Sequence, residues 1–300
     1  MVAGVDEEEK KVENMDRGFV KTDSFNIAYR QWGTSGKPIV LLHGIPMNST
    51  LWHHTGTVLS EHGYLVYAPE LLGLGYTEGP RDYDHSLRGQ AQLVDLFVNS
   101  VIGDECILVG HDLGGGVAQI IITELTTKVE KCVLTNCVAF DSWPIREIEV
   151  LIRGASKGNG GQDFTPEFVL NFLKRGLAAS VIDPSVVTDG LVGDLQQGLV
   201  GTIERREHFV RFLRAMNNEC TQEASPKLVL FRKSALLVWA RDDQFQPVTV
   251  GERLRNVLPH ATWKTIDGKH FHPLETTALA DAVRDWDAGL VDDYQCITAT

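Results

Sequence analysis

The stretch Cys106-Ile-Leu-Val-Gly110-His111-Asp112-Leu113-Gly114-Gly115 decides the fold of this chain. Its first four residues are apolar and predict a short buried strand, and the glycines that follow predict a sharp turn into a helix. Small residues around a turn let the backbone bend tightly enough to present one side chain at the apex. The apex residue is Asp112, which is ionised at neutral pH and can attack an electrophilic carbon without a base. The product of such an attack is an ester, which water must open in a second step.

Three further segments each place a candidate functional group just after an apolar run. The run from Lys37 to Pro46 ends in a turn that can aim a backbone N–H at a reacting centre. Within the segment 234–247, an apolar run is followed by the carboxylates Asp242 and Asp243. Within the segment 261–271, a further run is followed by His270. Asp112 alone is also typical of a helix cap. The order nucleophile, acid, histidine favours catalysis, because open α/β sheets bind ligands at the carboxyl ends of their strands.

These landmarks resemble motifs of the α/β-hydrolase family, over roughly residues 19–290. The closer likeness is to its aspartate-nucleophile branch, the haloalkane dehalogenases and epoxide hydrolases. The segment 43–52 is similar to the oxyanion turn of that branch, 110–115 to its Gly-His-Asp-x-Gly elbow, and 268–275 to its histidine loop. The resemblance implies an α/β-hydrolase fold, which is a mostly parallel, doubly wound sheet with an inserted helical cap.

The pattern of apolar residues divides the chain into three parts. Residues 1–17 are rich in charge and are expected to form a disordered tail, because they cannot bury enough apolar surface to offset the entropy of ordering. Short apolar runs that alternate with helical periods predict a core over residues 18–140 and 234–300, closing with an amphipathic helix over Leu274–Leu290. Residues 141–233 show a broken helical pattern, which we interpret as a cap that roofs the site.

The resemblance implies roles for two of the groups at the strand ends. Asp112 matches the nucleophile. His270 matches the base that activates water, because it stands two residues after Gly268 and five before Glu275, as the family pattern requires. His272 is the nearest alternative. A base of this kind keeps one ring nitrogen free while a carboxylate fixes the other N–H.

Asp243 is the carboxylate expected to orient His270. With Pro247 it fits the family's Asp-x-x-x-Pro turn, which leaves Asp242 as a turn or solvent residue. Some dehalogenases carry this acid after the sixth strand, where this chain has Asn136, a side chain that cannot carry the charge.

The backbone N–H groups of Ile45 and Leu113 are expected to form the oxyanion hole, aimed at the carbonyl oxygen of the Asp112 ester. Haloalkane dehalogenases hold the leaving halide with a Trp after the nucleophile and commonly an Asn or a second Trp. This chain has Leu113 and Ile45 at those two positions, which argues against halide release.

Epoxide hydrolases protonate the opening ring oxygen with tyrosines of the cap, yet residues 141–233 contain no Tyr. Trp143 and His208 are the alternative substrate-binding donors in this segment. Each also fits a role without substrate contact, Trp143 as a buried packing residue and His208 as an exposed helix residue.

Composition narrows the class of protein further. With 43% hydrophobic and 23% charged residues the chain resembles an ordinary globular enzyme, and its net charge of −12 argues against a nucleic-acid surface. The five cysteines show no CxxC spacing and are expected to be reduced. The acidic N-terminus and the absence of a long apolar run predict a cytoplasmic protein without a membrane partner. The sequence leaves open whether the chain forms a homodimer.

Together these observations predict a hydrolase that acts on a small, mostly apolar, neutral molecule, with water as its cosubstrate and without cofactor or metal. Opening of an epoxide or a related C–O bond is the leading reaction, because it can use other acid donors. The alternatives are carbon–halogen hydrolysis, and ester, lactone or C–C hydrolysis with Asp112 as base or acyl acceptor. A non-catalytic small-molecule receptor of the same fold is a further alternative, which an intact nucleophile, acid and base disfavour.

Overall fold

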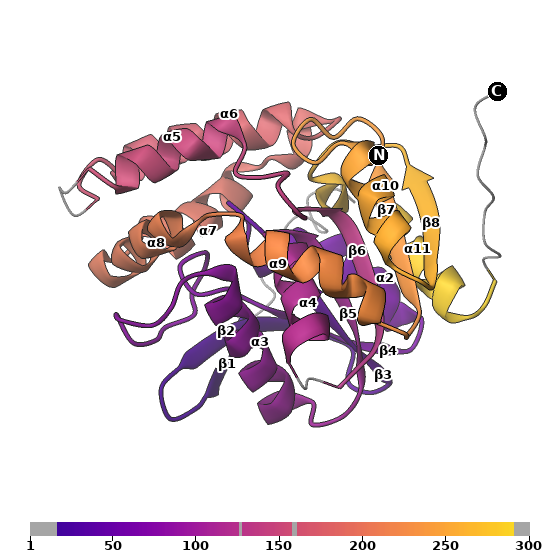
Figure 1. Ribbon diagram of the computed structural model, residues 1–300. Helices are drawn as coiled ribbons and strands as arrows, with labels where there is room; N and C mark the ends of the chain where they lie inside the picture. Colours follow the sequence, from indigo (N-terminus) through magenta and orange to yellow (C-terminus); the bar gives the residue numbers. More distant parts are fainter. Residues whose placement is uncertain (1–16, 126–127, 158–160, 291–300) are drawn as a thin grey trace, which may run out of the picture.

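The computed structural model describes residues 17–125, 128–157 and 161–290. The expected tail lies outside the described residues apart from Arg17, as do the last ten residues of the expected core, with Cys296. An eight-stranded sheet of order β1-β2-β4-β3-β5-β6-β7-β8 forms the centre of the molecule (Figure 1). The strands are β1 (Gly18–Lys21), β2 (Asn26–Trp32), β3 (Lys37–Leu42), β4 (Tyr64–Pro69), β5 (Cys106–Asp112), β6 (Val129–Cys137), β7 (Ala235–Ala240) and β8 (Ala261–Ile266).

The sheet is mostly parallel. Only the pairs β1–β2 and β2–β4 are antiparallel, and β4, β3, β5, β6, β7 and β8 run parallel to their neighbours. The chain places β4 on one side of β3 and then β5 on the other side, so the strand order reverses at β3. The carboxyl ends of β3 and β5 therefore border a crevice of the kind in which α/β sheets bind ligands.

Helices cover both faces of the sheet, as the alternating apolar pattern predicts. Helices α3, α4, α9 and α10 pack in one layer, and α2 and α11 pack together on the opposite face. The α-helices are α2 (His53–Glu61), α3 (Leu87–Val101), α4 (Leu113–Glu124), α5 (Arg146–Ala155), α6 (Pro166–Ala179), α7 (Asp189–Val200), α8 (Ile203–Ala215), α9 (Glu219–Lys227), α10 (Val248–Val257) and α11 (Ala278–Asp287). Short 3-10 helices are η1 (Ser49–Trp52), η2 (Pro184–Val186), η3 (Leu228–Leu230) and η4 (His272–Leu274).

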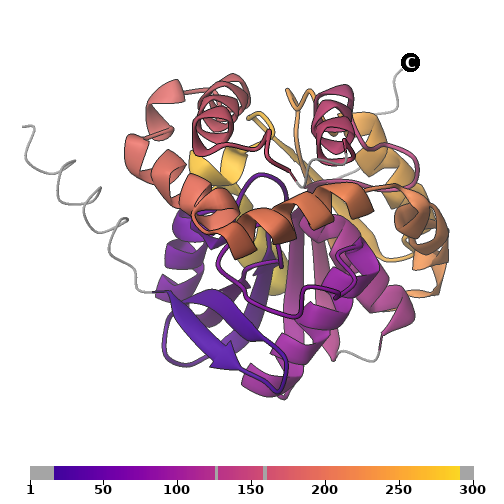
Figure 2. The same cartoon turned by 90° about the vertical axis from the view of Figure 1, so that its left-hand side faces the viewer.

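Helices α5 to α8 form a roof over one end of the sheet, coloured from pink to orange in Figures 1 and 2. Helix α9 falls inside the segment 141–233 that the sequence assigns to the cap, but it packs against α4 beside the sheet. The Ser225 hydroxyl of α9 donates to Oε1 of Gln119 in α4 at 2.7 Å. The chain thus returns to the layer that flanks the sheet before β7 begins.

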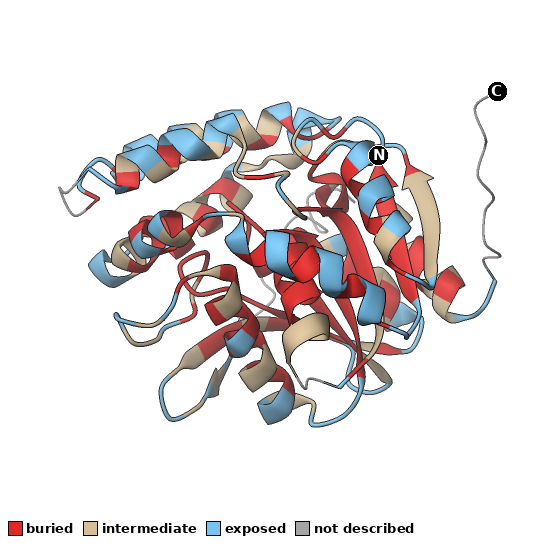
Figure 3. Ribbon diagram, viewed as in Figure 1, coloured by how far each residue is buried: buried red, intermediate tan, exposed pale blue. Residues whose placement is uncertain are grey.

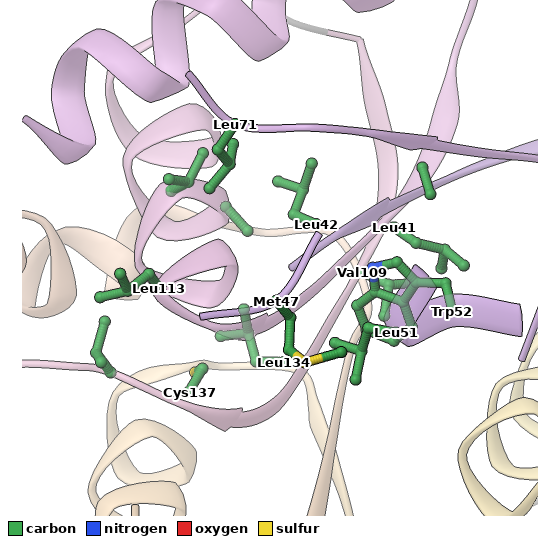
Figure 4. Close-up of a cluster of buried hydrophobic side chains, with 14 of the residues drawn as sticks. Leu41, Leu42, Met47, Leu51, Trp52, Leu71, Val109, Leu113, Leu134 and Cys137 are labelled. Carbon is green, nitrogen blue, oxygen red and sulfur yellow. The ribbon is translucent and has the colours of Figure 1, made fainter. Parts of the chain in front are cut away.

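The sheet strands carry the apolar core. Every residue of β5 and β7 is buried, and Figure 3 shows the buried strands between the partly exposed helices. Figure 4 shows part of this core, which includes Leu42, Leu51, Trp52, Val109 and Leu134. Four cysteines are unpaired and buried: Cys106, Cys132, Cys137 and Cys220. No helix within the described ranges is long and apolar enough to cross a bilayer.

The closing helix is shorter than the sequence predicts. Instead of one helix over Leu274–Leu290, the structure has η4 and then α11, which begins at Ala278. Pro273 opens the 3-10 turn, and the hydroxyl of Thr276 accepts a hydrogen bond from the Ala278 N–H at 3.2 Å. Proline and threonine favour such turns over helix interiors, so the helix is interrupted here. The spacing of apolar residues alone does not show this interruption.

Gly110→Ala is expected to lower the free energy of unfolding by at least about 2 kcal/mol. A Cβ atom at position 110 would lie 2.5 Å from Cα of Gly115 and 2.6 Å from the carbonyl oxygen of Gly114, and neither backbone atom can move without displacing α4. Urea unfolding measures the change. The control is Gly193→Ala in α7, where a Cβ meets no atom within 4 Å, and helix propensity should raise stability by about 1 kcal/mol. A neutral Gly110→Ala would show that α4 has freedom to shift against β5.

Candidate active site

The strained turn between β5 and α4 holds Asp112. Its backbone has φ 50° and ψ −123°, a conformation that L-residues rarely adopt. Glycine at 110, 114 and 115 makes the turn feasible, because Cβ atoms there would collide with α4, with the end of β3 and with Cys137 respectively. Strain of this kind persists only where the surrounding structure imposes it, and it is common at functional sites. The strand-to-helix elbow therefore holds the Asp112 carboxylate at the crevice beside β3.

Two backbone N–H groups meet the Asp112 carboxylate. The Ile45 N–H, in the turn after β3, donates to Oδ2 of Asp112 at 2.9 Å, and the Leu113 backbone also donates to this side chain. A side chain at Gly44 would collide with the carboxylate, so only glycine lets the turn approach so closely. The structure thus brings the Ile45 and Leu113 N–H groups to the Asp112 carboxylate.

His270 lies between Asp112 and a second carboxylate. Its Nδ1 lies 2.8 Å from Oδ2 of Asp243, and its Nε2 lies 4.0 Å from Oδ1 of Asp112. Because a carboxylate only accepts, Nδ1 carries the proton and Nε2 presents its lone pair toward Asp112. All three side chains are buried. The structure brings Asp112, Asp243 and His270 together, whereas Asp242 is exposed.

Asp243 is held by more donors than the sequence analysis identified. The backbone N–H groups of Phe245 and Gln246 donate to Oδ1 at 2.7 and 3.0 Å, and the side-chain amide of Asn136 donates to Oδ2 at 2.7 Å. Asn136 in turn accepts from the Ala240 N–H at 2.8 Å. The residue that the sequence analysis set aside because it carries no charge therefore fixes the acid from the neighbouring strand.

Burial and mutual charge shift the pKa values of all three groups. Burial raises the pKa of Asp112 to about 6, against the opposing effects of His270 and the Ile45 and Leu113 N–H groups. Burial alone would lower the pKa of His270, but the Asp243 carboxylate outweighs it and holds this pKa above its ordinary value. Burial likewise opposes ionisation of Asp243, yet His270 and the backbone donors hold its pKa below the ordinary value. Asp243 thus stays ionised at neutral pH, whereas the pKa of Asp112 lies closer to neutral.

Three other buried histidines brace the loops. His43 Nε2 accepts from the Leu71 N–H at 3.1 Å. His111 Nε2 donates to the backbone oxygen of His270 at 2.9 Å, and burial holds the pKa of His111 well below its ordinary value. Burial lowers the pKa of His272 to about 3, with its Nε2 at 3.1 Å from the Thr135 hydroxyl. These rings stay neutral, which suits hydrogen bonding in the loops rather than proton transfer.

A cavity of about 110 Å³ opens above Asp112 and His270, between the sheet and the cap. Its lining is mostly apolar, and the cap contributes residues such as Trp143, Ile148, Phe172 and Met216. Such a space suits a small, mostly apolar molecule. Among the described residues, no group of three or more His, Cys, Asp and Glu side chains could hold a metal ion.

The two expected cap donors do not offer a free N–H to this cavity. Trp143 lines it, but its indole N–H donates to the Thr221 hydroxyl at 2.8 Å. His208 is not among the lining residues, because α8 turns its ring onto the core loop, where it stacks on His85 with the two nearest nitrogens 2.9 Å apart. The structure therefore moves His208 out of the site. A buried amide that the sequence analysis missed, Gln246, lines the cavity instead, one residue before the Pro247 that marks the acid turn.

Comparison with known proteins identifies the family of this chain. The model of the Alpha/beta hydrolase family matches residues 39–282. The chain is 28% identical over 251 residues to a 2-hydroxy-6-oxononadienedioate/2-hydroxy-6-oxononatrienedioate hydrolase of Burkholderia vietnamiensis, covering 78% of this chain and 81% of that protein. Among solved structures it is similar to the epoxide hydrolase CorEH, with a TM-score of 0.71 and 20% identity over 92% of this chain and 99% of the other. The haloalkane dehalogenase DbeA of Bradyrhizobium elkani gives a TM-score of 0.75 and 18% identity over 92% and 98%. These two structural likenesses show a shared fold, and the family match spans most of the sequence, so the chain belongs to the alpha/beta hydrolase family.

Proposed function

We propose that this hydrolase uses Asp112 as a nucleophile, His270 as the base and Asp243 as the acid that orients it. The observation that carries the proposal is that the two oxygens of Asp112 have different neighbours. Oδ2 accepts the hydrogen bond of the Ile45 N–H, while Oδ1 faces Nε2 of His270 across 4.0 Å, beyond hydrogen-bonding distance. Oδ1, on the side of His270, is the oxygen that we expect to attack.

The same arrangement supports the second step. Once Oδ1 is bonded to the substrate carbon, Oδ2 becomes the carbonyl oxygen of the ester and still accepts from the Ile45 N–H, with the Leu113 N–H at the same carboxyl group. Water placed next to Nε2 of His270 loses its proton to that nitrogen and adds to the ester carbonyl. The negative charge that develops on Oδ2 then lies where backbone donors already point. Asp243 stabilises the imidazolium that forms.

The leading reaction is the opening of an epoxide or a related C–O bond in a small, mostly apolar, neutral molecule. The largely apolar cavity supports such a substrate. Leu113 and Ile45 stand where halide-binding residues would be needed, which disfavours carbon–halogen cleavage. The named hydrolase of Burkholderia vietnamiensis supports C–C hydrolysis as a second candidate, in which Asp112 acts as base or acyl acceptor.

Asp112→Asn is expected to lose turnover by about ten-thousand-fold and yet to gain stability above about pH 6. The raised pKa means that ionising Asp112 costs the folded state roughly 3 kcal/mol more than the unfolded chain, and the Asn variant avoids this cost. The wild type should lose stability as the pH rises from about 4 to about 6, so the advantage of the variant should vanish below about pH 4. Urea unfolding across this range measures it. Asp112→Ala controls for deamidation of Asn, and near-normal activity in it would exclude the nucleophile role.

Asp243→Asn is expected to lower kcat by about a thousandfold or more, whereas Asp242→Asn should change it by less than about twofold. Only the carboxylate of Asp243 contacts His270, and an amide there cannot stabilise the imidazolium. Steady-state rates of the two neighbouring variants, matched in chemistry and loop position, provide the comparison. A greater loss in Asp242→Asn would move the role of the acid to Asp242.

His270→Gln should complete the first step and stall as an ester on Asp112. Intact mass after addition of an epoxide should increase by the mass of the whole substrate, whereas a haloalkane would leave an adduct lighter by the halogen. Wild-type turnover in ¹⁸O-water should place label in the Asp112 carboxylate. Turnover with neither adduct nor label would mean that Asp112 acts as a general base, as the second candidate allows. Saturable binding without any turnover would indicate a receptor.

A further inference from the structure

Two buried, uncharged hydrogen-bond donors outside the proposed mechanism line the cavity, and the N–H of one of them, Trp143, is taken by Thr221. Gln246 lines the cavity together with Asp112 and His270, and its residue exposure is 2%. The other polar side chain of the lining, Glu147, is exposed. Gln246 is therefore the buried neutral side chain best placed to meet a polar atom of the substrate.

Three hydrogen bonds fix Gln246 in place. Its backbone N–H donates to Asp243 at 3.0 Å, and its backbone oxygen accepts from the Trp239 indole N–H at 2.8 Å. Its side-chain Oε1 accepts from the Ser142 hydroxyl at 2.9 Å. The backbone of Gln246 is thus anchored to Asp243 and to β7, and its side chain to Ser142.

The oxygen end of the Gln246 amide lies at Ser142 in the structure. The Ser142 hydroxyl accepts from the Ala139 N–H at 3.2 Å and donates its proton to Oε1 of Gln246. The NH₂ group is the remaining end of the amide. No acceptor among the described residues takes either N–H of this group. The amide nitrogen is not among the fully buried unpartnered atoms, and Gln246 lines the cavity, so its N–H groups are able to meet an acceptor that enters there.

We propose that the side-chain amide of Gln246 donates a hydrogen bond to a substrate oxygen in the cavity and so selects molecules that carry a neutral oxygen acceptor. This inference rests on the proposed function, in which that oxygen is the leaving atom. When Oδ1 of Asp112 bonds to carbon, the C–O bond breaks and its electron pair stays on oxygen, where the Gln246 N–H stabilises the charge. An amide gives up no proton under these conditions, so the oxygen takes its proton from water and leaves hydroxide. The cap contains no Tyr that could bind this oxygen, and Gln246 takes that role instead.

The test compares two ligands of nearly equal shape, cyclopentanone and methylenecyclopentane, which differ in whether they carry an oxygen acceptor. Titration followed by ligand-detected NMR should show that the wild type binds the ketone about tenfold more tightly than the alkene. Gln246→Met should reduce this preference to less than about twofold. The control is Gln244→Met, an exposed residue of the same loop that does not line the cavity, and it should keep the full preference.

A second variant guards against misfolding of the first. Gln246→Glu keeps the shape and the contact with Ser142 but has no N–H to donate at alkaline pH, so it should also lose the preference. The proposal is overturned if the wild type shows no preference, if Gln246→Met keeps it, or if Gln244→Met loses it equally.

Turnover of cyclopentene oxide separates this proposal from the proposed function. Gln246→Met should lower kcat by about tenfold or more with a smaller change in KM, because the charge on the oxygen develops after binding. A wild type that prefers the ketone but never opens the epoxide would contradict the proposed reaction and leave Gln246 as the recognition group. Unchanged epoxide turnover in Gln246→Met, without a ketone preference in the wild type, would contradict the role of Gln246 alone.

Discussion

The hydrogen bond from the Ile45 N–H to Oδ2 of Asp112 is the constraint on which the site depends. It joins the turn after β3 to the elbow after β5, the two strands between which the order of the sheet reverses. For this bond to form, the elbow must adopt a positive φ at Asp112, and glycines must stand wherever β3, β5 and α4 approach most closely. The fully buried β5 holds this geometry rigidly. Core packing thus determines which carboxylate oxygen meets the Ile45 N–H.

The parts of the site that follow strand ends could be predicted from the sequence, because short apolar runs and turn residues are local signals. Asp112, Asp243 and His270 each follow such a run, and parallel pairing brings these ends to one edge of the sheet. Asn136 was harder to interpret. Its side chain holds Asp243, which is more than a hundred positions away in the sequence. The lack of charge on Asn136 does not indicate this contact.

The cap was the least predictable part, because its side chains are oriented by long-range packing rather than by local pattern. Helical periodicity indicated helices between residues 141 and 233, but not that α9 returns to α4 or that α8 turns His208 onto His85. The Trp143 N–H is taken by Thr221, a contact that no spacing rule reveals. Gln246 lies in the core and next to a motif, yet its free amide depends on Ser142, across the entrance to the cap.

His111 joins the elbow to the backbone of His270, so the loops that carry Asp112 and His270 are braced within the core. Helices α5 to α8 supply other walls of the cavity but not this brace. The loop of His270 also meets the end of α6, where the Phe271 N–H donates to the Ser180 oxygen at 3.1 Å. We therefore expect substitutions elsewhere in α5 to α8 to reshape the cavity while both contacts stay in place. This separation makes the molecule modular in an evolutionary sense. New substrate ranges are accessible through the cap, by natural drift or in a mutant library, without rebuilding the reactive groups.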